Sequence, residues 1–558
     1  MRVARRHAES SIARPKRLGV NAFAVALAVW LVGGGPLRAE TPQHEQPRRL
    51  PTTPCELVSP AASEVTPWRL NESSHKSSSH KSSSHGSSSH ESSSAGPASN
   101  EEPLISTAFS SRSLEERLNA LEHSHARLRH EHAELKAQRK NVAQLGHGDA
   151  TLRINGRVHA DLWGFPGDSP GVNGFETGDP DLSPQDRLGF RRIRLGAYGE
   201  LPANMLYKVE MEFAGANDTE FRDVYLGWER LPFLQQLLVG NQKRPYGLDH
   251  LNSSNLNVFI ERPFVVEGFN QDARRFGVCA YGVSEDQAWN WRYGAFDQRL
   301  IQDEGNYIGD HWQGQVAGRL ANTAWWDDRS NGRRYAHWAV SGAWADTDAD
   351  ADAADDQPIS ESGVSEASFR TRPEARTVSR WLDTGVINGG DDYALVGLEG
   401  VVNVGPVQVV GEYLNVWQSR VGGDDLRFHG GYVYLAYTLT GEHLPWNRET
   451  GCIGRLEPFE NFFLVDRGRG ACRGLYHRGM GAWQAVLRFS YADFSDSDVQ
   501  GGVGESVTAG LNWYWTPHAS WQFNYLYGDI TDNDLNAAVG GPNFGDYHLL
   551  GARFRIDF

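Results

Sequence analysis

The last twelve residues, YHLLGARFRIDF (547–558), decide the fold, because the chain ends on a bare aromatic residue inside a strand pattern. Apolar side chains recur at every second position, at Leu550, Ala552, Phe554, Ile556 and Phe558. The alternate positions are Gly551, Arg553, Arg555 and Asp557. This period of two predicts a strand with one apolar and one polar face. In a soluble domain such a terminal strand would be an exposed edge, whereas a closed barrel in lipid removes the edge and covers the apolar face.

The composition favours a membrane role carried by alternating strands. Only 39% of the 558 residues are hydrophobic, so the sequence does not encode a bundle of membrane-spanning helices. The chain holds 18 Trp, 19 Tyr and 24 Phe, many in short alternating runs, and such residues form the lipid face and the interfacial girdles of barrels. No catalytic motif of the G-x-S-x-G, H-E-x-x-H or P-loop type is present, so we expect neither an enzyme nor a cofactor.

The first 39 residues are expected to be a secretory signal peptide. A basic region at Arg14, Lys16 and Arg17 precedes an apolar stretch from 18 to 32 and a small residue at Ala39. An uncleaved anchor is the alternative. Removing residues 1–39 takes away seven basic residues and one Glu, so the net charge moves from −16 to −22. A strongly acidic exported chain argues against nucleic acid as a partner.

Residues 40–105 have the composition of a disordered linker, because they are rich in Pro, Ser and Glu and almost without aromatic residues. The linker contains a histidine every five residues, at His75, His80, His85 and His90. These imidazoles could hold a transition metal loosely, but no carboxylate or thiol completes a defined site. We therefore expect a repetitive polar linker and no metal site.

Residues 106–140 are expected to form a short coiled coil. Ser113 and Glu116 make a capping box ahead of an apolar run. Leucines follow at a spacing of seven, at Leu114, Leu121, Leu128 and Leu135. About three heptads are marginal alone, so this helix would need a second oligomeric interface. A single surface helix is the alternative.

From residue 150 to the end at 558, sixteen alternating segments of about ten residues are separated by turn residues. The two weakest are QLLVGNQ (236–242) and RRFGVCAYGV (274–283). An even number of this size predicts an all-β fold, a 16-stranded antiparallel transmembrane β-barrel wide enough for an aqueous channel. Sorting the segments by face assigns the polar residues to the interior, for example Arg157, His159 and Lys208. A soluble sandwich is the alternative, but it would place the apolar side inside.

Several long segments resemble the phosphate-selective porin O and P family. They include RLGFRRIRLGAYGEL (187–201) followed by VGNQKRPYGLDHLNSSNLNVFIERPF (239–264), and YTLTGEHLPWNRETGCIGRLEPFENF (437–462) and GAWQAVLRFSYADF (481–494) in the same order as in the family. The resemblance covers about 150–558, and the family's short coiled coil ahead of the barrel also fits the heptads at 114–135. It implies a sixteen-stranded, usually trimeric porin of a Gram-negative-type outer membrane, with anions favoured in the best-known members. We expect both ends of the barrel chain on the periplasmic side.

Anion selection needs basic side chains at the narrowest point of a channel. The segment that resembles the family's first constriction-forming region supplies Lys243, Arg244 and Arg262, and the lumen face of neighbouring strands supplies Arg192, Arg194, Arg292, Arg319 and Arg488. With Arg553 and Arg555 they would make the pore wall positive. The alternative is that these arginines pair with Glu210, Glu212, Glu399 and Glu412 and only hold the barrel rigid. We expect a water-filled channel for passive diffusion of small solutes, mainly anions such as phosphate; a structural envelope anchor and a barrel hydrolase are the rival functions.

Two further features stay open. Asp346, Asp348, Asp350 and Asp352 alternate between two strands, so they belong to a long outer loop. A solvated acidic loop is favoured over a calcium site, because the glycine turn and terminal Glu of a calcium loop are missing. Cys452 and Cys472 could form one bridge within a loop or remain thiols.

Overall fold

The computed structural model describes residues 143–144, 150–215, 219–270, 273–301, 313–347, 368–466 and 476–558. The expected signal peptide (1–39), linker (40–105) and coiled coil (106–140) lie outside the described residues, as do Asp348 to Asp352 and Cys472.

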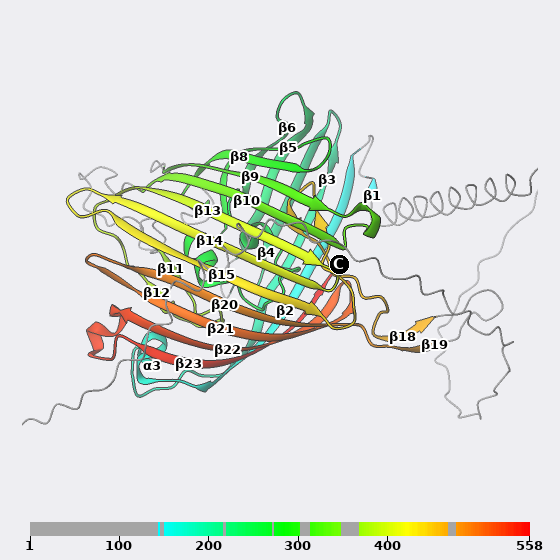
Figure 1. The fold of residues 1–558 in the computed structure, drawn as a ribbon. Helices are drawn as coiled ribbons and strands as arrows, with labels where there is room; N and C mark the ends of the chain where they lie inside the picture. Colours follow the sequence, from blue (N-terminus) through cyan, green and yellow to red (C-terminus); the bar gives the residue numbers. More distant parts are fainter. Residues whose placement is uncertain are drawn as a thin grey trace, which may run out of the picture. The chain divides into compact units, whose positions relative to one another are not determined.

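Sixteen antiparallel strands form a closed barrel (Figure 1). They are β2 (Thr151–Gly167), β3 (Arg187–Leu201), β4 (Met205–Glu212), β5 (Glu220–Leu231), β6 (Gln235–Lys243), β7 (Arg274–Val283), β8 (Trp289–Asp297), β9 (Gly314–Trp326), β10 (Arg334–Asp346), β13 (Gly390–Val404), β14 (Val407–Arg420), β15 (Leu426–Thr438), β20 (Ala482–Asp496), β21 (Val499–Thr516), β22 (Ala519–Asn533) and β23 (Gly545–Asp557). Each pairs with its neighbours in sequence, and β23 pairs with β2 to close the ring. A short strand β1 (Ala143–Gln144) also pairs with β2. The predicted strand count and fold class are therefore confirmed.

The terminal strand closes the barrel beside the first strand. β23 runs against β2 with Arg157 opposite Asp557 and Gly164 opposite Leu550. The backbone of Phe558 exchanges hydrogen bonds of 3.0 and 3.1 Å with Gly156. The Phe558 ring lies over Gly156, where an added Cβ would come within 2.4 Å of the ring, and it is 66% exposed. The terminal aromatic residue therefore has the predicted position beside the first strand, with its ring on the outside.

The two faces of the wall differ in chemistry as the alternation predicts. Large apolar side chains are exposed on the outside; examples from distant strands are Ile154, Val209, Val340, Leu487 and Ile556. Polar side chains on the alternate positions are buried inside, including Gln315, Gln408, Gln484, Asn512 and Gln522. An apolar outer wall fits lipid, and a polar inner wall fits water.

The helices of the described residues are short. They are α3 (Pro170–Thr177), α4 (Leu248–Leu251), α5 (Phe264–Phe269) and the 3-10 turns η1 (Asp328–Ser330) and η3 (Asp534–Val539). Within the described part of the chain, none of them has the length and apolar character that a membrane-spanning helix requires.

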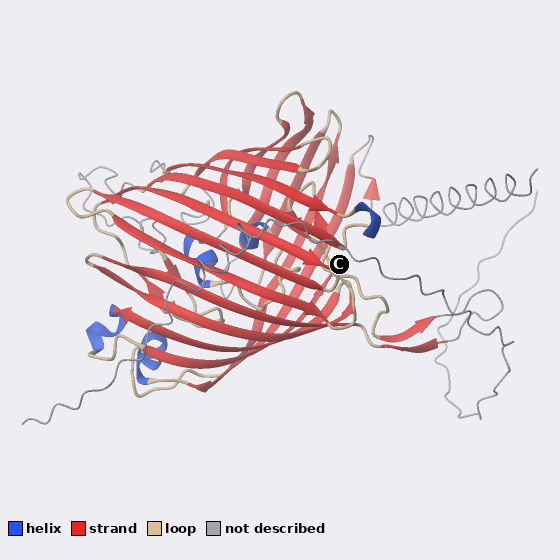
Figure 2. Cartoon of the chain, viewed as in Figure 1, coloured by secondary structure: helices blue, strands red, loops and turns tan. Residues whose placement is uncertain are grey.

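Described parts of three long connections lie inside the barrel, where short helices are seen within the ring of strands (Figure 2). We call the end where β2 begins and β23 ends the closing rim. The β6–β7 loop (244–273) carries α4 and α5, and the β10–β13 loop (347–389) carries β11 (Arg370–Thr371) and β12 (Leu382–Asp383); both leave the opposite rim. The β15–β20 loop (439–481) leaves the closing rim; its strands β16 (Trp446–Asn447) and β17 (Cys452–Ile453) turn into the barrel, whereas β18 (Phe463–Asp466) and β19 (Tyr476–Gly479) form a hairpin that extends away from the barrel (Figure 1).

One side of the lumen is filled by an apolar core. Helix α5 packs against β14, β15 and β20 and against β11 of the β10–β13 loop. The ring of Phe369 lies 5.6 Å from Phe269, 5.7 Å from Tyr393 and 5.5 Å from Phe428 between ring centroids. All four rings are buried. We call this region, between α5, the β10–β13 loop and strands β13–β15 and β20–β22, the apolar half of the lumen.

Candidate functional site

A polar cavity of about 480 Å³ lies on the other side of the lumen, against β2 to β8. The β6–β7 loop and the β15–β20 loop complete its lining, with Leu251 and Ser254 from the first and Thr450 and Cys452 from the second. Seven basic side chains line it: Arg157, Arg194, Lys208, Lys243, Arg262, Arg274 and Arg292. Two carboxylates, Glu210 and Asp223, line it as well. We call this region the polar half of the lumen.

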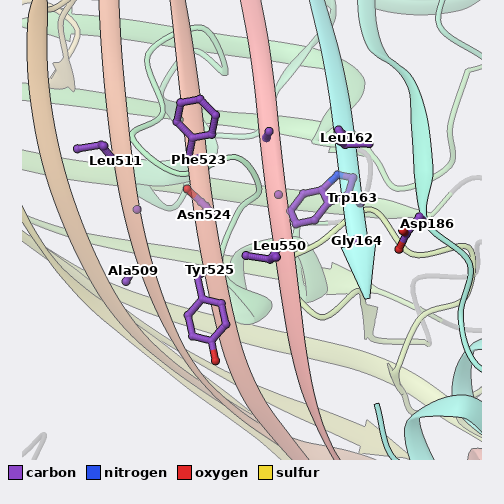
Figure 3. Close-up of a pocket in the computed structure, with 13 residues that line it drawn as sticks. Leu162, Trp163, Gly164, Asp186, Ala509, Leu511, Phe523, Asn524, Tyr525 and Leu550 are labelled. Atoms are coloured by element: carbon purple, nitrogen blue, oxygen red, sulfur yellow. The ribbon is translucent and has the colours of Figure 1, made fainter. Parts of the chain in front are cut away.

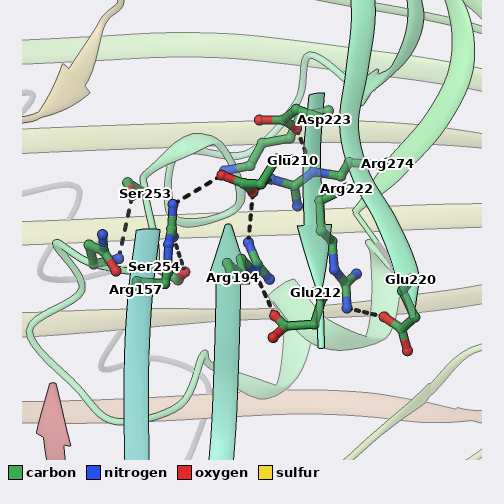
Figure 4. A network of polar contacts seen from close by, with 12 residues as sticks. Arg157, Arg194, Glu210, Glu212, Glu220, Arg222, Asp223, Ser253, Ser254 and Arg274 are labelled. Carbon is green, nitrogen blue, oxygen red and sulfur yellow. Dashed lines mark hydrogen bonds and ion pairs between the residues drawn. The ribbon is translucent and has the colours of Figure 1, made fainter. Parts of the chain in front are cut away.

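Glu210 is the centre of an ion-pair network on the wall of the cavity (Figure 4). Its carboxylate lies 3.3 Å from Arg157 Nη2, 3.3 Å from Arg194 Nη1 and 3.8 Å from Arg274 Nη2. Arg274 also donates to Asp223 at 2.5 Å, and Lys208 pairs with Asp223. Arg194 also pairs with Glu212, so four cations share three carboxylates and the network keeps one positive charge in excess.

Lys243 and Arg292 reach the cavity without a carboxylate partner in the described part of the chain. The Lys243 ammonium donates to the backbone carbonyls of residues 250, 251 and 252 at 2.7, 3.0 and 2.9 Å. Arg292 donates to the backbone carbonyl of Thr450 and lies 5.2 Å from the centroid of the Tyr281 ring. A carbonyl holds a cation in place without cancelling its charge, so Arg292 presents net positive charge to the cavity.

Arg262 and Arg194 are more fully compensated. Arg262 Nε lies 2.9 Å from Asp249 Oδ1 and also donates to the Asp249 carbonyl at 3.2 Å. Arg194 Nε donates to Glu212 at 2.5 Å in addition to its contact with Glu210. Of the eight basic residues that the sequence nominates, Arg194, Lys243, Arg262 and Arg292 line the cavity.

The other four nominated residues lie elsewhere in the lumen. Arg244 is buried, donates to Gln298 at 3.0 Å and lies 5.4 Å from the Tyr246 ring. Arg319 pairs with Glu399 and donates to the Gly451 carbonyl at 2.9 Å, so it ties the β15–β20 loop to β9. These two side chains hold loops and walls together.

Arg192 and Arg488 flank the β6–β7 loop. Arg488 donates to the Glu261 carbonyl at 3.0 Å and to Glu374 at 2.6 Å. Arg192 is 5% exposed, and its Nε and Nη1 atoms are buried without a hydrogen-bond partner in the structure as described. Of the pairings that the alternative names, Arg194 pairs with Glu210 and Glu212 and Arg319 pairs with Glu399, whereas Arg488 pairs with Glu374 instead.

Glu261 of the β6–β7 loop binds the wall near the terminal strand. It accepts from Arg191 Nε at 2.8 Å and from Arg553 Nη2 at 2.6 Å. Burial alone would raise the pKa of the Glu261 carboxyl, but the charges of Arg191 and Arg553 outweigh it and hold the pKa well below its usual range. Arg553 also pairs with Asp161 at 2.6 Å, and Arg555 donates to Ser520 at 2.6 Å. Arg553 thus faces the lumen as expected, but its charge is matched by two carboxylates.

The basic lining is completed by Arg157, Lys208 and Arg274, which were not among the pore residues predicted from the sequence. The alternation already assigns Arg157 and Lys208 to the lumen face, so that signal was present. Arg274 begins one of the two weakest strand segments, and its place depends on the register of β7 with β6, where it lies opposite Lys243. The lining from the β15–β20 loop was also missed, because barrel connections at this rim are usually short turns.

The cysteines of the described chain are thiols. Cys279 is buried in β7, and Cys452 is partly exposed at the cavity. Within the described ranges, no group of three His, Cys, Asp or Glu side chains is arranged to hold a metal ion.

A second depression, of about 560 Å³, lies over β2 and β21 to β23 (Figure 3). Leu162, Leu511, Phe523 and Leu550 line it, and these side chains belong to the exposed apolar face of the wall. Among the described residues that line it, Asp186 is the one carboxylate and none is basic. This depression lacks the chemistry of a site for charged solutes.

Comparison with known proteins places the barrel in a family. An uncharacterized protein of Caulobacter vibrioides is 26% identical over 427 residues, covering 75% of this chain and 76% of that protein. The outer membrane channel DcaP of Acinetobacter baumannii is similar in structure, with 11% identity, a TM-score of 0.43 and coverage of 75% of this chain and 99% of DcaP. An anion-selective porin from Comamonas acidovorans shows 11% identity and a TM-score of 0.41 over 74% of this chain and 100% of that porin.

The family description "phosphate-selective porin O and P" matches residues 153–558, which include nearly the whole barrel. The match covers the wall strands, the inner loops and the polar cavity. The chain therefore belongs to the phosphate-selective porin O and P family, and its barrel is a channel of the outer membrane.

Proposed function

We propose that the channel passes small anions by passive diffusion and that they cross the lumen through the polar half. The observation that carries this proposal is the lining of the cavity, where seven basic side chains face two carboxylates. Positive charge in a low-dielectric constriction attracts anions more strongly than the same charge in open water. The family description supports phosphate as one of these anions.

The geometry of the basic groups fits transit better than tight retention. Arg157, Arg194 and Arg274 each contact Glu210 with one nitrogen. The Lys243 ammonium donates to three backbone carbonyls. An anion would meet several partial partners in succession, which favours entry without preventing exit. The acidic charge of the rest of the chain does not cancel this field, because screening limits its reach to about 10 Å at 0.1 M salt.

The test is the reversal potential of single channels in planar bilayers under a KCl gradient. We expect a preference for chloride in the wild type, and a shift toward potassium in Arg292→Glu, because Arg292 faces the cavity without a carboxylate partner in the described chain. Arg420→Glu is the matched control. Arg420 lies at the opposite rim, paired with Asp498 at 2.7 Å, and its replacement should shift the potential less. A wild-type channel that already prefers potassium would overturn the proposal and leave a general porin.

We further propose a homotrimer in which residues 106–140 supply register and the barrel walls supply most of the contact area. The heptad of leucines from Leu114 to Leu135 supports this assembly. Deleting 106–140 should lower the fraction of trimer in mild detergent without unfolding the barrel, which heat-modifiable migration on gels would report. An intact protein that is monomeric in mild detergent would contradict the assembly.

A further inference from the structure

Glu374 is a buried carboxylate in the β10–β13 loop that contacts three other parts of the barrel interior. Its side chain is 0% exposed. Oε1 accepts a hydrogen bond from the backbone N–H of Phe264, the first residue of α5, at 3.2 Å. Oε2 accepts from Arg488 on β20 at 2.6 Å and from Ser506 on β21 at 2.9 Å. One carboxylate therefore joins the inner helix to two strands of the wall.

The backbone at Glu374 is held in an uncommon conformation. Its φ is 56°, in the left-handed region that residues with a side chain rarely adopt. Such a conformation persists only where the surrounding contacts impose it. The contacts around Glu374, which include those of its carboxylate and a backbone hydrogen bond to Arg372, therefore hold the loop in this conformation.

The same loop contacts α5 at two more places. Arg372 Nη1 donates to Glu267 Oε1 at 3.1 Å. The Phe369 ring packs edge-on against Phe269, with 5.6 Å between the centroids. The beginning, middle and end of α5 are thus each tied to the β10–β13 loop.

Helix α5 lies in the apolar half of the lumen. With α5 against β14, β15 and β20, the apolar half is filled, and the polar cavity lies against β2 to β8. We propose that Glu374 is a positioning residue of the channel, which keeps α5 against the wall so that solutes are confined to the polar half. The conductance part of this proposal is independent of the proposed function, and the selectivity part rests on it.

Loss of the Glu374 charge should loosen the contact between α5 and the wall, because Arg488 then loses its carboxylate partner. Arg488 is buried and lies 4.4 Å from the centroid of the Phe259 ring. Without Glu374 its guanidinium is a buried charge whose carboxylate partner is gone, and such a charge draws in water or moves toward it. Either response opens space between α5 and β20.

The experiment compares single-channel conductance and reversal potential in Glu374→Gln and the wild type. We expect roughly a twofold rise in conductance and a reversal potential nearer zero, since the new path lacks the basic lining of the cavity. The double variant Glu374→Gln with Arg488→Met removes both charges, so its conductance should return toward the wild-type value. A merely structural loss of stability would not be rescued in this way.

Glu176→Gln is the matched control. Glu176 of α3 accepts from the backbone N–H of Val378 at 2.9 Å and from Trp381 Nε1 at 2.9 Å, so it holds the same loop near the opposite rim. None of its hydrogen bonds or ion pairs in the described structure involves the β6–β7 loop, and we expect wild-type conductance. A folded Glu374→Gln channel with wild-type conductance would overturn the proposal.

If Glu374→Gln does not fold, Arg372→Gln provides the test, because it removes the partly exposed contact with Glu267 together with one hydrogen bond to the Thr377 carbonyl within the same loop. A smaller rise in conductance would support the proposal, and an unchanged conductance would overturn it. A wild-type channel without anion preference would refute the proposed function while leaving these conductance comparisons valid.

Discussion

The two halves of the lumen are enclosed by the same barrel yet have opposite chemistry. Against β2 to β8, seven basic side chains line a cavity of about 480 Å³. Against β13 to β15 and β20 to β22, the rings of Phe269, Phe369, Tyr393 and Phe428 form a buried core. Wall and loops both create the difference, because Tyr393 and Phe428 belong to strands β13 and β15, whereas Phe269 and Phe369 come from the loops that enter the barrel. The closed wall forms the lumen, and the apolar side chains of these strands and loops fill one half of it.

The largest expected effect comes from the apolar half. Phe369→Ala removes a ring that contacts three others, and a substitution of this kind costs about 3–5 kcal/mol of stability in a packed core. We expect a lower urea midpoint and a lower temperature for the heat-modifiable transition, together with higher channel conductance. A variant with unchanged stability and conductance would show that the apolar core does not close this half.

The strands of the wall could be predicted from the sequence, whereas the contacts of the inner loops could not. All sixteen strands could be predicted, because the alternation of apolar and polar residues is a local pattern. Within each strand it shows which side chains face outward and which face the lumen. The contacts inside the lumen could not be predicted, since Glu374 meets Arg488 across 114 positions and Arg553 meets Glu261 across 292. Nothing in the sequence near Glu374 distinguishes it from an exposed loop carboxylate. About half of the basic lining could be predicted, because the alternation along a long strand shows which residues face the lumen. Arg274 could not be assigned in this way, since it begins a strand whose alternation is weak.

The second prediction concerns Glu261, which lies at the boundary between the halves. Its pKa is held well below the usual range by Arg191 and Arg553 after burial has acted against ionisation. A carboxyl with a lowered pKa in the folded state stabilises that state above its unfolded pKa of about 4.5, and this contribution is lost as the pH falls further through the folded pKa. We expect unfolding temperatures to be similar at pH 7 and 5 and to fall below pH 4.

Glu261→Gln separates this residue from the other carboxyls. The variant should be less stable than the wild type at pH 7, because Arg191 and Arg553 lose a shared partner. Its stability should also decline less between pH 5 and pH 3, since the titrating group is gone. Equal acid slopes in both proteins would place the pH dependence elsewhere.

The third prediction uses the two described cysteines as reporters of the polar half. Cys452 lines the cavity, whereas Cys279 is 0% exposed. In a background with Cys55→Ser and Cys472→Ser, a charged methanethiosulfonate should modify Cys452 and lower the single-channel current. The same reagent should leave the current of a Cys452→Ser variant unchanged. A wild-type current that survives complete modification of Cys452 would place the solute path outside this cavity.

The smallest expected effect also comes from the polar half, at Ser254. Its Oγ accepts a hydrogen bond from Arg157 Nη1 at 3.0 Å on the lining of the cavity. A hydrogen bond to a charged group contributes about 1.5–3 kcal/mol to stability. Water in the cavity can replace the acceptor that Ser254→Ala removes, so the free energy of unfolding should fall by less than this.

The direction in which the reversal potential shifts distinguishes the two halves of the lumen. In Ser254→Ala the Arg157 donor turns from a protein oxygen to the cavity, so anion preference should rise slightly while conductance stays near the wild-type value. Phe369→Ala should instead raise conductance and weaken anion preference, because it opens a path without basic residues. Arg157→Gln is the control that removes the donor itself, and it should lower anion preference. If Ser254→Ala and Phe369→Ala shifted the reversal potential in the same direction, both halves would contribute to one wide path, and the division of the lumen would be wrong.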